Sequence, residues 1–148
     1  MKIAIGSDHA GFEYKEPVIE MLKARGIEVI DFGTHDKDST DYPTYAFKVG
    51  NAVVAKTADL GVLICGTGVG MSIAANKVKG VRAGAVQSSF AAKAVKEHNN
   101  ANILCVGSRT NTLEEVLQFV QVYIDTPYSE GVRHSKRIHM ISDYEEEQ

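Results

Sequence analysis

The sequence has no tryptophan, only two cysteines and a formal net charge of only −3. Cys65 and Cys105 lie far apart and form neither a disulfide framework nor a zinc-binding pattern, which favours a reducing compartment. A charge balance so close to neutral predicts no general affinity for nucleic acid or for an anionic membrane. No apolar run is long enough to span a membrane, and the first one is too short for a signal peptide. We therefore expect a cytoplasmic protein that binds neither nucleic acid nor membrane.

The length of 148 residues predicts a single domain, residues 1–148, without linkers or repeats. Short apolar runs alternate along the chain with segments that have the apolar spacing of helices. The clearest helix follows Thr112 and Glu115, which have the spacing of a capping box. Strands that alternate with helices pair in parallel and are covered on both faces, so the sequence predicts an α/β fold. The runs predicted as strands are residues 2–5, 27–31, 60–65, 81–86 and 102–106.

Polar and glycine-rich residues follow several of these strands. Asp8 and His9 come after the first strand, Cys65 ends the third, and Arg109 follows the last. In open parallel sheets, ligands bind at the carboxyl ends of the strands. This edge of the sheet is therefore the predicted site. Asp8 and His9 either cap their own loop or hydrogen-bond the hydroxyl groups of a ligand.

The stretch LICGTGVGMSIAANK, residues 63–77, places a thiol at the start of a glycine-rich turn that leads into a helix. Backbone N–H groups at a helix start bind anions, and glycine lets a ligand approach closely. Met71 stands where a dinucleotide fingerprint needs glycine, and no Walker A loop occurs. The glycines could serve only to make a tight turn. The thiol argues for more, because a helix start stabilises a thiolate, which can act as nucleophile or base. Cys105, within an apolar strand, is expected to be inert.

Two arginines near the C-terminus, Arg133 and Arg137, lie four residues apart and share one face of a predicted helix. Together with Arg109 they could bind a phosphate group, because the guanidinium fork matches its oxygens. An exposed basic face without a ligand is the alternative. His134 and His139 lack the spacing of metal ligands, as does every other set of side chains, so we expect no metal ion and no cofactor.

Five motifs occur in order between residue 1 and about residue 140: GSDHAGF, TDYP, LICGTGVGMSIAANK, HNNANILCVGSR and GVRHSKRI. Together they resemble the family of B-type ribose-5-phosphate isomerases, which includes the galactose-6-phosphate isomerase subunits. The resemblance implies a flavodoxin-like or Rossmann-like three-layer α/β/α sandwich with a five-stranded parallel sheet. It also implies a metal-independent enzyme of the pentose phosphate pathway. Such an enzyme interconverts ribose 5-phosphate and ribulose 5-phosphate through an enediolate after the sugar ring has opened.

By this resemblance, Cys65 is the general base, Thr67 supports it, and His98 opens the furanose ring. His98 precedes the last strand, so it should lie at the amino edge of the sheet, about one strand length or 17 Å from Cys65. If both residues are catalytic, His98 must therefore enter the site from a neighbouring chain. The residues that the resemblance implies for substrate binding are Asp8, His9, Tyr42, Gly66, Thr67, Gly68, Val69, Gly70, Asn99, Arg109, Arg133 and Arg137.

One branch of this family carries its base as a glutamate at the position of Met71, so the chain resembles the other, cysteine-based branch. The resemblance implies a homodimer, with a tetramer as the alternative, and a C-terminal helix of about residues 128–144 that packs on the partner subunit. Galactose-6-phosphate and allose-6-phosphate are alternative substrates. A phosphosugar sensor without catalytic activity is a further alternative, although a sensor has no use for a base at Cys65.

Overall fold

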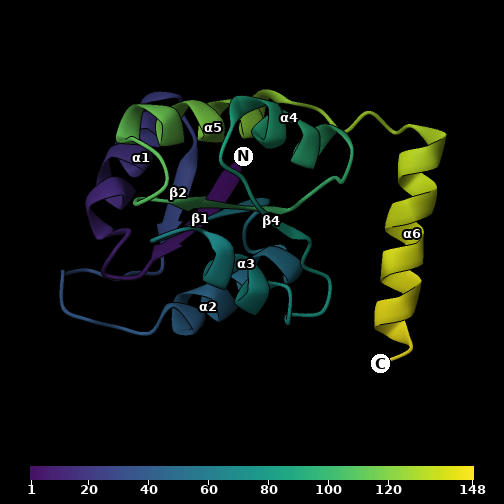
Figure 1. Ribbon diagram of the computed structural model, residues 1–148, viewed down its shortest axis with the longest axis horizontal. Helices are drawn as coiled ribbons and strands as arrows, with labels where there is room; N and C mark the ends of the chain where they lie inside the picture. The colour runs from purple at the N-terminus through teal and green to yellow at the C-terminus, as the bar shows by residue number, and fades with distance from the viewer.

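The computed structural model describes residues 1–148 and has three layers, with a sheet between two sets of helices (Figure 1). All strand pairs are parallel. The predicted α/β sandwich with a five-stranded parallel sheet is therefore confirmed. The order across the sheet is β2-β1-β3-β5-β4, so the last two strands are exchanged relative to the flavodoxin order. The strands are β1 (Lys2–Ser7), β2 (Glu28–Asp31), β3 (Leu60–Cys65), β4 (Ala83–Ala85) and β5 (Ile103–Gly107).

Helices cover both faces of the sheet. Three of them pack with one buried cluster and two with the other. Those on the first face are α1 (Phe12–Ala24), α4 (Ser89–Glu97) and α5 (Leu113–Asp125), and those on the second are α2 (Tyr42–Val54) and α3 (Val69–Ala75). The sequence of β3 is apolar throughout because both faces of this strand are buried. Val62 and Ile64 face the first cluster, whereas Leu63 and Cys65 face the second.

The predicted capping box is present at the start of α5, where the Thr112 hydroxyl accepts from the Glu115 N–H and the Glu115 carboxylate accepts from the Thr112 N–H. No helix of the chain combines the length and the apolar character that crossing a membrane requires.

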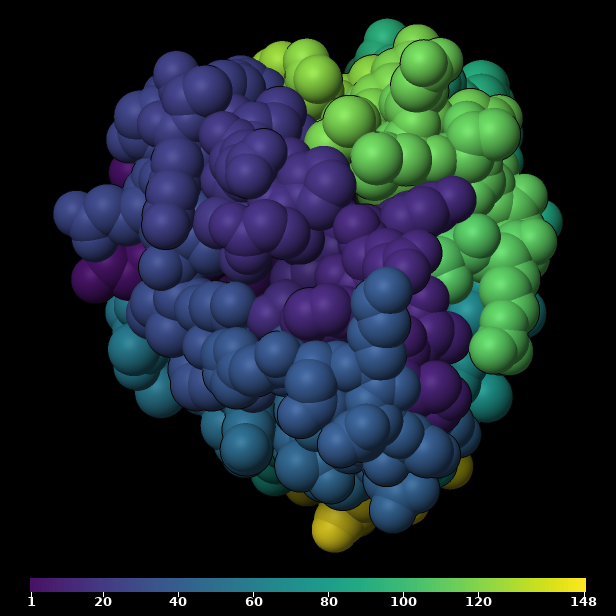
Figure 2. All heavy atoms as spheres, turned by 90° about the vertical axis from the view of Figure 1, so that its left-hand side faces the viewer, coloured from purple at the N-terminus to yellow at the C-terminus, as the bar shows by residue number.

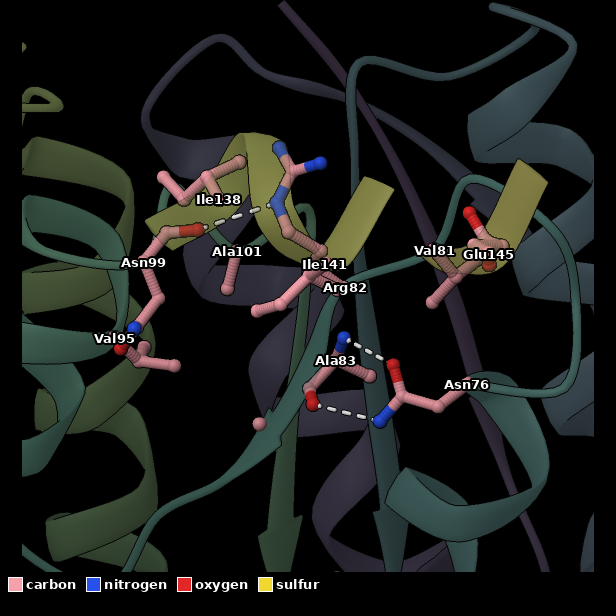
Figure 3. A pocket seen from close by; sticks show the side chains of 11 residues that line it. Asn76, Val81, Arg82, Ala83, Val95, Asn99, Ala101, Ile138, Ile141 and Glu145 are labelled. Atoms are coloured by element: carbon pink, nitrogen blue, oxygen red, sulfur yellow. Dashed lines mark hydrogen bonds between the residues drawn. The ribbon is translucent and has the colours of Figure 1, made fainter. Parts of the chain in front are cut away.

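The last helix, α6 (Val132–Glu146), stands beside the sandwich and contains no buried residue (Figure 1). Its ring stack, hydrogen bonds and ion pair with the body lie near its two ends. Near its start the His134 ring stacks on His98, and near its end the Glu145 carboxylate accepts from the Gly80 N–H. Between the helix and the body lies a cavity of about 420 Å³, shown in Figure 3. Exposed apolar side chains on α6 include Val132, Met140, Ile141 and Tyr144.

Candidate active site

Cys65, the last residue of β3, lies under the glycine-rich turn. Cys65 is only 4% exposed, and its Sγ accepts a hydrogen bond from the Gly68 N–H at 3.1 Å. Gly68 has a φ of +80°, a conformation that favours glycine, and this conformation turns the chain back over the sulfur. The thiol predicted to stand at the start of the turn is thus in direct contact with it.

The turn is fastened to the segment that follows β5. The Arg109 N–H donates to the Gly66 carbonyl at 2.8 Å, and the Ser108 N–H donates to the Cys65 carbonyl at 2.9 Å. A Cβ atom at Gly107 would lie only 2.6 Å from the Thr67 Cα, so this close packing requires glycine. The Arg109 side chain lies over Gly66, with Nη1 3.3 Å from the position of a Cβ there. It makes no ion pair and places an unpaired cation beside the turn.

The start of α3 continues the same surface. The Val69 N–H donates to the Thr67 hydroxyl at 3.2 Å, and both residues are exposed. The Tyr42 ring, at the start of α2, lies so close to Gly70 that a Cβ there would be 2.7 Å from the ring. The turn therefore has an open outer side, with Tyr42 beside it.

Asp8 and His9 follow β1 at the same edge of the sheet. One oxygen of the buried Asp8 carboxylate accepts from the Ala10 and Gly11 N–H groups, so this residue caps its loop. No hydrogen bond joins its other oxygen to the protein. The His9 Nδ1 accepts from the Thr40 N–H at 3.2 Å, which leaves Nε2 free to meet a ligand. In Figure 2 the segment that follows β1 (purple) lies between two other segments. On one side are the residues before and at the start of α2 (blue), and on the other side are the residues around the start of α5 (green).

His98 and Asn99 lie at the opposite edge. Cys65 pairs with Gly107, whereas Ile103, the first residue of β5, pairs with Gly61. These pairs are separated by four residues, or about 13 Å along the strand, and His98 precedes even Ile103. One chain therefore holds the two groups too far apart to contact a single small sugar.

The His98 ring is stacked on His134 of α6, with centroids 4.4 Å apart and planes 9° from parallel. Desolvation lowers the pKa of His134, and the neighbouring His98 and the positive charges of Arg133 and Arg137 lower it further. Both arginines are exposed, make no ion pair, and line a cavity of about 330 Å³ on α6. In the sequence analysis, His134 was considered only as a metal ligand, and its spacing did not fit that role. Nothing in the local sequence pattern predicts its stacking on His98. No three side chains of His, Cys, Asp or Glu gather in a way that could hold a metal ion.

Residues 3–141 match the model of the Ribose/Galactose Isomerase family. Ribose-5-phosphate isomerase B of Escherichia coli is 45% identical over 145 residues, which cover 98% of this chain and 97% of that protein. The structure of Clostridium thermocellum Ribose-5-Phosphate Isomerase B has a TM-score of 0.97 at 46% identity and covers 99% of both chains. That of the Mycoplasma genitalium enzyme with bound ribulose-5-phosphate has a TM-score of 0.95 at 42% identity, covering 99% of this chain and 97% of that one. The family resemblance found in the sequence is confirmed, and the chain belongs to the Ribose/Galactose Isomerase family.

Proposed function

We propose that this protein is a ribose-5-phosphate isomerase that interconverts ribose 5-phosphate and ribulose 5-phosphate. The observation that carries the proposal is the buried Cys65 thiol under a turn whose Gly68 N–H points at its sulfur, in a chain whose relatives have this activity. A base and an oxyanion cradle side by side are what isomerisation through an enediolate needs. The relatives are named for the five-carbon sugar, which disfavours a six-carbon phosphosugar as the main substrate.

In the proposed chemistry, the Cys65 thiolate removes the proton from C2 of the open-chain aldose. The electron pair of that bond forms the C1–C2 double bond, and the carbonyl electrons move to O1. The thiol then returns the proton to C1, the carbonyl forms at C2, and the proton of the C2 hydroxyl ends on O1. The backbone N–H groups of residues 66–70, with Thr67 ordering the turn, stabilise the oxyanion as it develops.

The sugar ring must open before this step, and we assign that role to His98 with Asn99 beside it. The imidazole takes the proton of the C1 hydroxyl and delivers a proton to the ring oxygen as the C1–O bond breaks. Since His98 lies at the amino edge of its own sheet, the His98 that serves Cys65 comes from a second copy of the chain. Because His134 of α6 stacks on His98, we assign Arg133 and Arg137, on the same helix, to the same copy of the chain as His98.

The minimal unit is thus a homodimer in which α6 packs on the partner subunit and covers exposed side chains such as Met140 and Tyr144. One copy contributes Cys65, residues 66–70, Asp8, His9, Tyr42 and Arg109. The other contributes His98, Asn99, Arg133 and Arg137. The arginines would hold the phosphate, while Asp8 and His9 would contact the sugar. Both cysteines are free thiols, which is in keeping with a cytoplasmic enzyme.

The test is an isomerase assay with ribose 5-phosphate, ribulose 5-phosphate and six-carbon phosphosugars, run on the parent protein and on Cys65→Ala with and without a chelator. We expect turnover of the five-carbon pair by the parent, no effect of the chelator, and no exchange of the C2 proton with solvent in Cys65→Ala. Exchange at the parent's rate in Cys65→Ala would rule out this base, and Asp8 would be the next candidate. A parent that binds phosphosugars without converting them would be a sensor.

The shared site has its own test. Cys65→Ala and His98→Ala proteins, each nearly inactive alone, should regain activity when mixed under conditions that exchange subunits, because each heterodimer contains one intact site. Persistent inactivity after verified exchange would contradict a site built from two chains.

A further inference from the structure

We propose that Arg82 is a positioning residue for His98 and Asn99, and that it acts on ring opening rather than on the proton transfer at Cys65. This inference rests on the proposed function. Arg82 directly precedes β4 and is half-buried, and its side chain reaches across to the turn that connects α4 with β5 (Figure 3).

The contact is a fork on two successive carbonyl groups. The Arg82 Nε donates to the Asn99 carbonyl at 3.2 Å, and Nη2 donates to the Asn100 carbonyl at 3.0 Å. Figure 3 draws the first of these bonds. The main chain of Arg82 is also tied to the end of the turn, since its N–H donates to the Asn102 side chain at 2.8 Å and its carbonyl accepts from the Asn102 N–H at 3.0 Å. Arg82 therefore holds the turn that follows His98 at three of its residues.

Three carbonyls in the last turn of α4 already have partners. Those of Val95, Lys96 and Glu97 accept from the N–H groups of Ala101, Asn100 and Ser129. Asn100 has a φ of +46°, so the chain reverses there through the left-handed region. The carbonyls of Asn99 and Asn100 have only the Arg82 guanidinium as a protein partner. A helix end leaves such carbonyls for side chains or water to satisfy, and a charged donor binds them more strongly than a neutral one.

Arg82 makes no ion pair with a carboxylate, so the guanidinium is not held by a competing partner. Lysine presents a single ammonium group and cannot reproduce a planar fork on two carbonyls. The loss of this fork should let the Asn99 and Asn100 carbonyls turn toward water and shift the adjacent His98 and Asn99 side chains. A catalytic group displaced by about 1 Å costs on the order of a hundredfold in rate.

The experiment separates ring opening from proton transfer by the choice of substrate. Ribose 5-phosphate forms a furanose through its C4 hydroxyl, whereas ribulose 5-phosphate remains open because phosphate blocks its C5 oxygen. We expect Arg82→Gln to lower kcat with ribose 5-phosphate by roughly tenfold to a hundredfold, with a smaller effect in Arg82→Lys. Exchange of a C1 proton of ribulose 5-phosphate with solvent should stay near the parent's rate, as it should in His98→Ala. In Cys65→Ala both measurements should collapse.

Arg25→Gln is the matched control, because Arg25 makes a surface ion pair with Asp125 between α1 and α5 and does not contact the turn. It should leave both measurements unchanged. The positioning role is overturned if Arg82→Gln slows C1-proton exchange as much as ring-dependent turnover, or if it leaves both untouched. If Arg82→Gln does not fold, Arg82→Lys carries the same comparison. Loss of exchange only in Cys65→Ala would uphold the proposed function even if the Arg82 inference fails.

Subunit mixing gives a second readout that a general loss of stability would not produce. Arg82→Gln mixed with Cys65→Ala should regain turnover of ribose 5-phosphate, because one site of the heterodimer then has an intact Cys65 and an intact Arg82–His98 unit. Arg82→Gln mixed with His98→Ala should not, because both changes damage the same contribution to each site. Recovery in the second mixture, or its absence in the first while Cys65→Ala and His98→Ala complement each other, would overturn the assignment.

Discussion

Replacing Gly68 by alanine should reduce activity by more than the strain of the left-handed backbone conformation alone would explain. Gly68 has a φ of +80°, and its N–H is the donor to the Cys65 sulfur. A Cβ at this position would lie 3.1 Å from main-chain atoms of Cys105 and Val106 in β5. These atoms belong to a buried central strand and cannot rotate away as a side chain would. The turn must therefore lift off β5, and the N–H must move relative to the sulfur.

Gly26 provides the matched control. Its φ is +77°, but nothing lies within 4 Å of a Cβ placed there. The left-handed conformation costs a non-glycine residue about 1–2 kcal/mol, so both variants lose this much stability. At Gly68 the close contact adds the cost of overpacking, about 1–3 kcal/mol. We expect a total loss of roughly 2–5 kcal/mol for Gly68→Ala, against about 1–2 kcal/mol for Gly26→Ala.

Urea unfolding measures the two losses of stability, and initial rates with ribose 5-phosphate measure the catalytic effect. Gly26→Ala should keep the parent's kcat, whereas Gly68→Ala should lose on the order of a hundredfold in kcat, because a donor and a base shift together. Equal stabilities of the two variants, or full activity in Gly68→Ala, would refute the reasoning that links the tight turn to the base.

The phosphate and thiol assignments yield two more predictions. Arg133→Ala and Arg137→Ala should each raise KM strongly with some loss of kcat, because remote binding energy helps to position the sugar. Unchanged affinity for ribose 5-phosphate in both would remove α6 from the phosphate site. Limiting iodoacetamide should label Cys65 first, with loss of activity in step and protection by phosphosugar. Cys105 should stay unlabelled, because it is fully buried and burial raises the pKa of its thiol. Equal labelling of both thiols by mass spectrometry would contradict this.

The strands that are buried on both faces were the most predictable part of the fold. The apolar run 60–65 coincides with β3, because every one of its residues is buried. The run 81–86 shortens to the edge strand Ala83–Ala85, although the residues on either side of it still hydrogen-bond to β5: the Arg82 carbonyl accepts from the Ile103 N–H, and the Val86 N–H donates to the Cys105 carbonyl. The exchanged order of the last two strands was not predictable, because apolar spacing describes each strand alone and not its neighbours.

The same limit applies to the candidate site. The rule that ligands bind at the carboxyl ends of parallel strands predicted that Asp8, Cys65 and Arg109 would lie at one edge, and β-strand order placed His98 at the other. The stack of His98 on His134 and the fork of Arg82 join segments far apart in the sequence. Neither histidine spacing nor an arginine before a short strand indicates such a contact.

Met71 offers a way to move the base within this site. It is fully buried in the first turn of α3, in the same cluster as Cys65, and it stands where another branch of the family is expected to carry a glutamate. In a Cys65→Ala background, Met71→Glu should restore proton exchange to about a hundredfold above Met71→Gln, near the lower end of what a positioned general base contributes. The glutamine variant has the same shape and no basic group. A carboxylate at a helix start is stabilised by the helix dipole, although its burial should cost roughly 1–3 kcal/mol of stability. Equal exchange in the two folded double variants would show that a base at this position cannot reach the sugar.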